Sequence, residues 1–227
     1  MSAAAPLSVA MREGSAAAHR EAEGSPFMAR LVAGELPVAG YVAYLRRLRV
    51  VYAALEDTAA AHADLPGVAA VRDPAVERLA ALDADLAHWG AVPDAGPGSG
   101  GAPSHSPVAA AYAARIRASV APVGAAPAGA RFVAHHYTRY LGDLSGGQAI
   151  GRVLARQHDL PDGRGVAFYA FDDVPRPKPY KDAYRARLDA LGASWHDTAR
   201  AEVVAEVGVA FGLNQRLFAE LGELTSC

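Results

Sequence analysis

Cysteine, lysine and long apolar runs are scarce in this chain of 227 residues. The single cysteine is Cys227, the last residue, which excludes an intrachain disulfide, a thiolate cluster and a four-cysteine zinc site. No run of 18 or more apolar residues is present, so we expect no helix that spans a bilayer and no membrane anchor. The first residues lack the basic flank and apolar stretch of a signal peptide, so we expect a cytoplasmic protein.

The charge is nearly balanced, with 22 Lys and Arg against 24 Asp and Glu. No overall basic field is present, so nucleic acid is not an expected partner. Ala contributes 53 of the 227 residues, a bias typical of a GC-rich genome, yet the larger apolar residues still suffice for one core. Intrinsic disorder and a small disulfide-rich scaffold are therefore excluded.

Apolar residues recur with helical periodicity along most of the chain. Residues 160–179 are rich in Pro, Gly and Asp and hold one weak strand-like patch at 167–171. We predict an all-α protein with about eight helices in a single domain at 1–227. Its core is expected at 7–224, with flexible ends at 1–6 and 225–227 and a Gly/Pro-rich loop at 91–106. The predicted helices are about 8–20, 26–32, 38–62, 74–88, 107–119, 128–158, 181–191 and 197–221.

Three glycines, Gly142, Gly146 and Gly147, interrupt the long helical segment. An interior glycine costs a helix about 0.5–1 kcal/mol relative to Ala, which this chain uses freely elsewhere. Gly142 and Gly146 are four residues apart and share a helix face, so a flat ligand could approach the backbone there, or the helix could bend. Close helix packing and a helix C-cap are the alternatives. A phosphate loop is excluded, because no Lys-Ser/Thr follows the glycines.

Histidines are the next candidates for residues that bind a metal or a ligand. His19 precedes Glu23 by four residues on a predicted helix, and neutral imidazole oriented by a carboxylate is a common iron ligand. A surface or packing histidine is the alternative. His135 and His136 are a weak metal signal, because adjacent helical residues point about a quarter-turn apart.

Polar residues also cluster around the glycines and on a later helix. Tyr137, Thr138, Arg139 and Asp143 form either a surface network or a hydrogen-bond system for a ligand on the glycine face. Lys181 and Arg185 are four residues apart, with Arg187 close by; they either bind carboxylates or form a solvated helix face.

The stretch 134–148 closely resembles the signature of the heme oxygenases, and 12–28 resembles the segment that carries that family's proximal histidine. Blocks similar to the family at 51–56, 85–89, 180–185 and 211–218 follow in the right order, so the resemblance covers nearly all of the chain. It implies a heme oxygenase-like fold and an enzyme that cleaves heme with dioxygen and reducing equivalents. The implied products are biliverdin, expected as the α isomer, carbon monoxide and ferrous iron.

The same resemblance implies roles for individual residues. His19 would ligate the iron of heme b, with Glu23 beside it, and Gly142 and Gly146 would let the helix lie on the heme plane. Asp143 would hold a distal water network. The residues implied to share this network are Tyr52, Thr138, Arg139 and Asn214. Those implied to line the propionate side are Arg12, Tyr137, Lys181 and Arg185, and Phe211 would wall the distal pocket.

Two departures from the family pattern have consequences. Ala16 stands where some relatives have a basic residue, so that propionate contact is not expected. The membrane anchor of the animal enzymes is not found, so the implied electron donor is a soluble ferredoxin or flavin reductase.

Two other functions are compatible with a helical domain of this kind. A non-catalytic heme carrier or sensor would need His19 and the propionate anchors but not Asp143. A thiaminase-like helical hydrolase would need an internal cysteine nucleophile, which this sequence does not contain.

Overall fold

The computed structural model describes residues 5–90 and 106–224, and all regular secondary structure within them is helical. The all-α prediction is confirmed, with eleven α-helices in these residues rather than about eight. The predicted loop and flexible ends lie almost entirely outside the described residues. The helices are α1 (Leu7–Gly14), α2 (Ala16–Glu23), α3 (Pro26–Ala33), α4 (Val38–Ala61), α5 (Pro66–Val71), α6 (Leu79–His88), α7 (Pro107–Ala118), α8 (Phe132–His136), α9 (Gln148–Gln157), α10 (Pro177–Ala193) and α11 (Asp197–Leu224).

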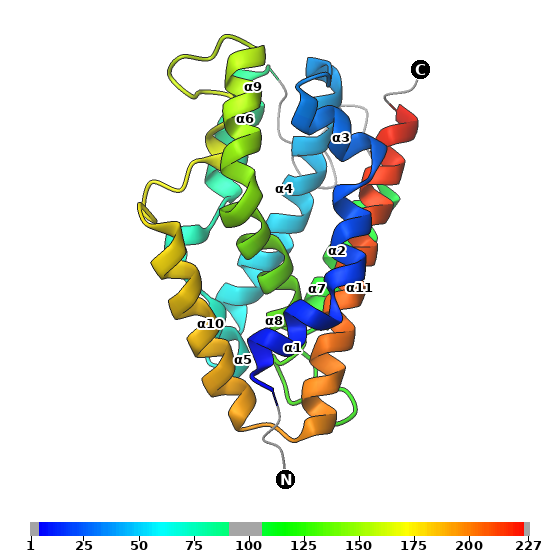
Figure 1. The fold of residues 1–227 in the computed structure, drawn as a ribbon, viewed down its shortest axis with the longest axis vertical. Coiled ribbons are helices and arrows are strands. Elements are labelled where there is room, and N and C mark those ends of the chain that lie inside the picture. The colour runs from blue at the N-terminus through cyan, green and yellow to red at the C-terminus, as the bar shows by residue number, and fades with distance from the viewer. Residues whose placement is uncertain (1–4, 91–105, 225–227) are drawn as a thin grey trace.

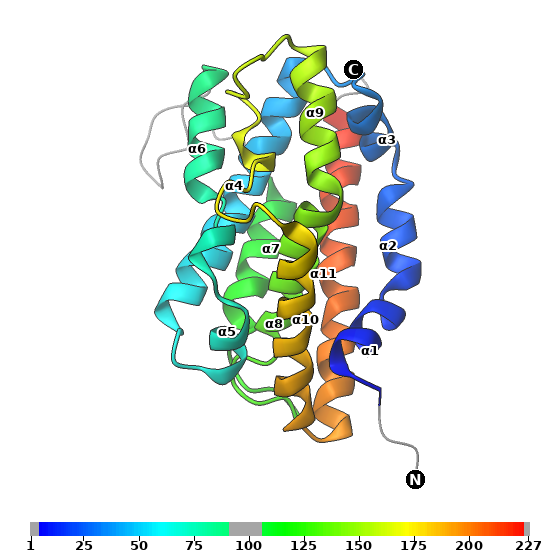
Figure 2. The same ribbon diagram turned by 60° about the vertical axis from the view of Figure 1, so that its left-hand side comes forward.

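The two longest helices, α4 and α11, run along the long axis of the molecule (Figure 1). α4 packs against α6 and α7, whereas α11 packs against α1, α2 and α8. Turning the molecule shows α2 as an outer helix beside α11 (Figure 2). Buried side chains from these helices join in one hydrophobic core, as one domain requires.

Local signals explain where several helices begin. Pro26 and Pro107 each occupy the first turn of a helix, where the missing N–H is tolerated. The hydroxyl of Ser25 accepts a hydrogen bond from the N–H of Met28, and Ser106 caps α7 in the same way. These starts agree with the predicted ones.

Other predicted bounds were wrong. The helix expected at 8–20 is divided at Ser15, whose hydroxyl donates to the carbonyl of Met11. The helix expected at 74–88 begins only at Leu79, because Pro74–Val76 forms a 3₁₀ turn (η1). The helix expected from 128 begins at Phe132, and α5 was not predicted.

The strand-like patch at 167–171 is not a strand. Ala167–Tyr169 forms a 3₁₀ turn (η4), and the N–H groups of Ala167 and Phe168 donate to the buried carboxylate of Asp85 at 2.7 and 2.8 Å. The side chain of a distant helix thus takes the place of a neighbouring strand as hydrogen-bond partner for this segment.

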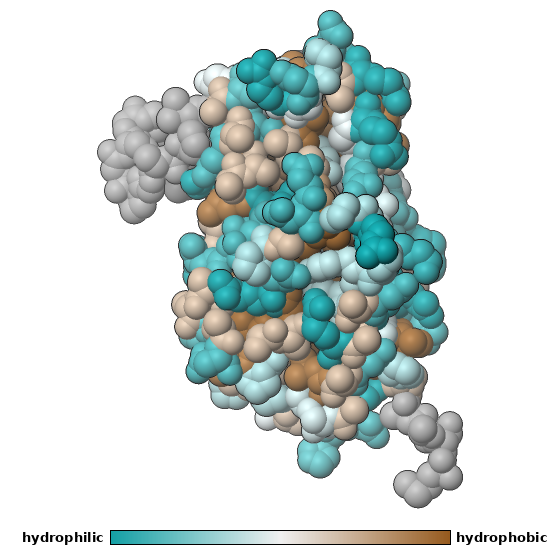
Figure 3. Space-filling view, turned by 90° about the vertical axis from the view of Figure 1, so that its left-hand side faces the viewer, coloured by the Kyte–Doolittle hydropathy of each residue, from teal (hydrophilic) through white to brown (hydrophobic). Residues whose placement is uncertain are grey.

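Hydrophilic residues dominate the left-hand side of Figure 1, with apolar residues in small scattered patches (Figure 3). Among the described residues, no helix combines the length and the apolar character needed to cross a membrane.

Candidate active site

The long helical segment that carries the glycines is open on one face. We call residues 132–157 the glycine helix; it consists of α8, two π-helical segments (η2, Tyr137–Leu141, and η3, Asp143–Gly147) and α9. Such wide turns are frequent at functional sites. Gly142 and Gly146 are exposed. A Cβ built at either position meets nothing within 4 Å among the described residues, apart from its chain neighbours and the helix's own backbone. Close packing therefore does not explain these two glycines.

The glycines further along the same helix do serve packing. A Cβ at Gly151 would lie 2.7 Å from Cβ of Tyr169, and one at Gly147 would lie 3.2 Å from Cδ1 of that ring. Both glycines let η4 approach the helix closely. The four glycines therefore divide into an open pair and a packed pair.

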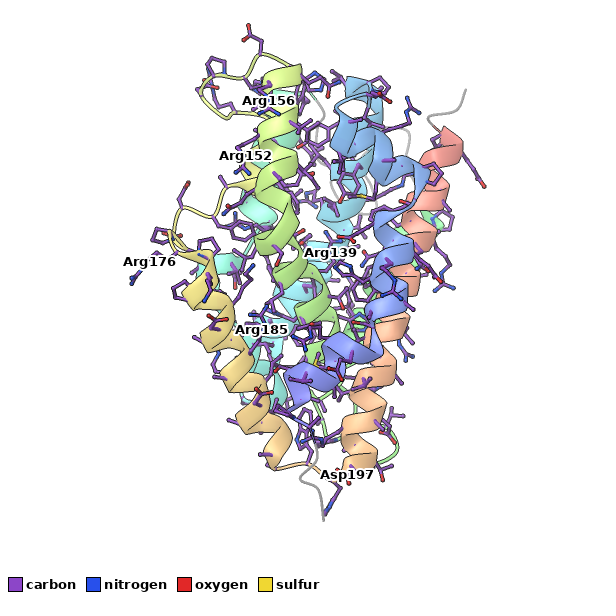
Figure 4. The ribbon with its side chains drawn as sticks, in the orientation of Figure 1. Arg139, Arg152, Arg156, Arg176, Arg185 and Asp197 are labelled. Carbon is purple, nitrogen blue, oxygen red and sulfur yellow. The ribbon has the colours of Figure 1, made fainter. Side chains whose placement is uncertain are left out.

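Asp143 lies at the centre of a buried polar network beneath the open glycines. The Tyr52 hydroxyl donates to Oδ2 of Asp143, and the Arg139 guanidinium lies 3.4 Å from Oδ1. Arg139 also donates to Oδ1 of Asn214 at 3.0 Å and to the Tyr52 hydroxyl at 3.3 Å. Figure 4 shows Arg139 in the middle of the molecule, where the glycine helix passes α4 and α11. The cluster is thus an interior network rather than a surface one.

Burial raises the pKa of the Asp143 carboxyl well above its usual range, because the charged form loses its hydration. A carboxyl of this kind keeps its proton at a pH where an exposed aspartate has lost it. Thr138 is buried beside this network, but its hydroxyl donates to the carbonyl of Ala134 at 2.8 Å, within its own helix.

His19 lies on α2, with about half of its side chain exposed. Its Nδ1 is 3.3 Å from a carboxylate oxygen of Glu23, one helical turn later. The ring meets Phe211 edge-on, with centroids 5.6 Å apart. Phe211 and Asn214 are three residues apart on α11, so this helix contacts both His19 and the Asp143 network.

Cations from α1 and α10 approach the glycine helix. Nζ of Lys181 donates to the Ser145 hydroxyl at 3.0 Å, next to Gly146. Burial raises the pKa of Tyr137, and the positive charges of Arg185 and Arg12 oppose this rise, so both guanidinium groups lie near that phenol. Figure 4 shows Arg185 on α10, facing the glycine helix. The predicted cationic residues therefore converge from separate helices.

Arg187 does not belong to this cationic group. It donates to the carbonyl of Ala70 at 2.9 Å, and its guanidinium stacks over the rings of Tyr180 and Tyr184. It helps to hold α10 against α5 instead.

His135 and His136 have separate partners, as their quarter-turn separation predicts. His135 Nε2 is 2.9 Å from Glu206, whereas His136 Nδ1 is 2.9 Å from the Tyr184 hydroxyl. Burial lowers the pKa of His136 to about 3, so that ring is neutral. In the described parts of the chain, no three His, Cys, Asp or Glu side chains gather as a metal site.

Two buried groups were missed in the sequence. Glu206 on α11 binds Arg115 and His135, and Tyr169 lies against the glycine helix. A buried glutamate on a long amphipathic helix gives no local signal. Tyr169 could have been found from Gly147 and Gly151, which share a helix face and leave room for a ring.

A cavity of about 390 Å³ lies at the turn between α10 and α11 and does not include these residues. It is lined by Pro66, Gly67, Ala125, Pro127, Ala128, Leu191, Ser194, Trp195, His196 and Ala199.

Comparisons with known proteins find similarity along nearly the whole chain. The family model described as Heme oxygenase matches residues 5–220. Heme oxygenase 1 of Homo sapiens is 34% identical over 220 residues, which cover 96% of this chain and 72% of the human protein. Heme oxygenase 1 of Nostoc sp. is 32% identical over 211 residues, covering 93% and 84% of the two chains.

A solved structure agrees with these sequence matches. The crystal structure of heme oxygenase-1 from the cyanobacterium Synechocystis, in complex with heme, has a TM-score of 0.81 and 31% identity to this chain. The similarity covers 96% of this chain and 92% of that one, so it extends far beyond the glycine helix.

Proposed function

The chain belongs to the heme oxygenase family, and we propose that it cleaves heme held between α2 and the glycine helix. It is a heme-degrading enzyme, and the resemblance found in residues 134–148 is confirmed. The observation that carries the proposed site is the open face at Gly142 and Gly146 beside the buried Asp143 carboxyl. The open face admits a flat ligand to the backbone, and the carboxyl beside it can supply a proton.

The residues present fit heme as the substrate. Glu23 lies against Nδ1 of His19, which leaves Nε2 as the nitrogen for the iron. Phe211, expected as a wall of the distal pocket, contacts the edge of the imidazole on the His19 side. Arg12, Lys181 and Arg185 offer charge-assisted hydrogen bonds to the propionates.

Bound heme supplies the iron that binds dioxygen and the ring carbon that is oxidised. The protein must bring protons to this place while keeping the dioxygen next to one edge of the ring. Asp143 holds a proton because its pKa is raised, and Tyr52 and Arg139 fix the orientation of its carboxyl. Asn214 fixes Arg139 in turn. The backbone at Gly142 and Gly146 would lie against a heme held on this face and would limit the space left for other ligands there.

A heme carrier would use His19 and the cations but would have no use for a buried acid beside the ring. Cleavage also needs electrons, for which we propose a ferredoxin or a flavin reductase as the donor protein. The expected product is the α isomer of biliverdin.

Titration of the protein with heme, followed by turnover with a generic electron donor, tests the proposed function. We expect a saturable Soret band and then the absorption of biliverdin. Heme binding without biliverdin would instead identify a carrier, and the absence of binding would contradict the site.

A further inference from the structure

The helix that carries His19 has little hold of its own on the core. Of the eight residues of α2, all of them described, only Ala22 is buried. Ser15, at its N-terminus, donates its hydroxyl back to the carbonyl of Met11 and does not cap the helix. A helix shorter than about 12 residues is not stable by itself in water. The position of α2 therefore depends on its contacts with other helices, of which α11 is the main one.

Gln215 on α11 makes two hydrogen bonds to α2. Its Nε2 donates to the backbone carbonyl of Ala18 at 3.1 Å and to a carboxylate oxygen of Glu21 at 3.1 Å. A carboxamide nitrogen carries two N–H groups, so both bonds can form at once. α11 itself is embedded in the core along most of its length. Gln215 thus fastens the backbone next to His19 to one of the two longest helices.

The contacts of α11 on either side of Gln215 are aromatic and less directional. Phe211, one turn earlier, meets the His19 ring edge-on with centroids 5.6 Å apart, and Phe218 stacks on Phe27 of α3 with centroids 5.8 Å apart. Ring pairs of this kind tolerate a range of offsets, whereas a hydrogen bond weakens steeply once its angle falls below about 120°. The carboxamide of Gln215 is therefore the group that defines how α2 is rotated and where it lies along α11.

We propose that Gln215 is a positioning residue, which holds α2, and with it the His19 imidazole, in one orientation before heme binds. Ala18 and His19 are neighbours in the chain, so the hydrogen bond to the Ala18 carbonyl directly restricts the backbone of His19. A ligand that is fixed in advance can bind iron without the cost of ordering its helix. The inference rests on the proposed role of His19 as the iron ligand.

Gln215→Leu removes the carboxamide and keeps a side chain of similar size and good helix propensity. The first measurement is amide hydrogen exchange of residues 16–23 in the heme-free protein. We expect these amides to exchange about tenfold faster than in the wild type, which corresponds to about 1.4 kcal/mol for the two lost hydrogen bonds. The second measurement is the iron–histidine stretching band of the ferrous heme complex, from resonance Raman spectroscopy. We expect this band to shift and broaden, because the imidazole is then free to take several orientations.

Two further variants separate the hydrogen bonds from packing. Gln215→Lys restores a donor that can reach the same carbonyl and carboxylate, so we expect it to return both measurements most of the way to the wild-type values. Gln157→Leu is the matched control, because Gln157 on α9 also donates from Nε2 to a backbone carbonyl, that of Leu36, at 3.1 Å. It should leave the exchange of residues 16–23 and the Raman band unchanged.

Unchanged exchange in Gln215→Leu, an equal increase in Gln157→Leu, or faster exchange with an unaltered Raman band would each overturn the proposal. A Gln215→Lys variant that behaves like Gln215→Leu would also overturn it, because the effect would then come from packing. An iron–histidine band that persists in His19→Ala would instead contradict the proposed site. The exchange data, obtained without heme, would still show whether Gln215 holds α2.

Discussion

The Tyr52 hydroxyl donates a hydrogen bond to the Asp143 carboxylate and so joins α4 to the glycine helix. The Tyr52 ring also meets Phe168 edge-on, with centroids 5.3 Å apart. The acid is therefore oriented by groups from distant parts of the chain, and its position depends on the fold as a whole rather than on its own helix.

Asp143→Ala is expected to separate heme binding from heme cleavage. Ala is favourable in a helix, and the heme contacts of the proposed site do not use this carboxyl. A positioned general acid contributes about 10²–10⁴ in rate, so we expect biliverdin formation to fall by at least about 100-fold at similar heme affinity. Asp57→Ala, which removes an exposed carboxylate from α4, is the control. A wild-type yield from Asp143→Ala would assign Asp143 a structural role only.

His19→Ala removes the proposed iron ligand. We expect the spectrum of the heme complex to lose the signature of histidine ligation and turnover to stop, while heme still binds through ring burial and propionate contacts. Added imidazole should restore part of the activity, because it can occupy the place of the lost side chain. His62→Ala, at the end of α4, should leave both spectrum and turnover unchanged. Full turnover of His19→Ala without imidazole would exclude His19 as the ligand.

The propionate anchors are expected to decide which ring carbon is attacked. Apolar contacts fix the in-plane rotation of heme weakly, and the propionates break its near symmetry. Charge-assisted hydrogen bonds are worth about 1.5–3 kcal/mol before solvent screening, and about 1.4 kcal/mol already gives a tenfold preference. We expect Lys181→Ala/Arg185→Ala to produce a mixture of biliverdin isomers, separable by chromatography. Lys178→Ala, which removes an exposed lysine from α10, should still give the α isomer. Pure α product from the double variant at undiminished heme affinity would contradict the anchoring role.

Periodicity and proline positions predicted most helices, because these signals lie within a few residues of each other. The division at Ser15 was not predictable in the same way. A Cβ at Gly14 would lie 2.5 Å from Cγ1 of Val204, so the end of α1 is shaped by its close contact with α11. That contact joins residues from opposite ends of the chain and leaves no local pattern.

The candidate site also contains residues that a local pattern predicts and residues whose position depends on distant parts of the chain. The motif at 134–148 identified Asp143, Arg139 and the open glycines, because they lie within one helix. The turn at 167–169 was misread as strand-like, since its apolar residues resemble a short strand and its true hydrogen-bond partner, Asp85, is 82 residues away. Tyr169 lies on this misread turn, and the spacing of Gly147 and Gly151 was the remaining signal for it.

Glu206 is expected to make the fold sensitive to acid. Burial alone would raise its pKa, but hydrogen bonds from His135 and Arg115 lower it from 4.5 to about 2. A carboxyl whose pKa is lower in the folded protein than in the unfolded chain stabilises the fold at any pH above the unfolded pKa. This stabilisation is lost as the pH falls from about 4.5 to about 2. Burial also lowers the pKa of His135, so its protonation favours the unfolded chain below about 6.5.

We therefore expect Glu206→Gln to lower the free energy of unfolding by about 1–3 kcal/mol at pH 7, because it takes the carboxylate partner from the buried Arg131 and the partly exposed Arg115. The difference from the wild type should shrink as the pH approaches about 2. Urea unfolding across this range measures both effects, with the exposed Glu13→Gln as the control. A difference that stays constant with pH would show that Glu206 acts through packing rather than charge.

The open and packed glycines of the glycine helix predict opposite outcomes for the same substitution. Gly146→Ala adds a methyl group that meets no neighbouring element, so the heme-free protein should keep its stability or gain about 0.5–1 kcal/mol from the better helix former. The methyl group would occupy the face proposed to lie on the heme, and we expect weaker heme binding and slower turnover. Gly151→Ala would bring a carbon to 2.7 Å from Cβ of Tyr169, so it should lower the melting temperature of the heme-free protein. Thermal unfolding and heme titration of the two variants measure this contrast. Unimpaired heme binding and turnover in Gly146→Ala would show that heme does not lie on this face.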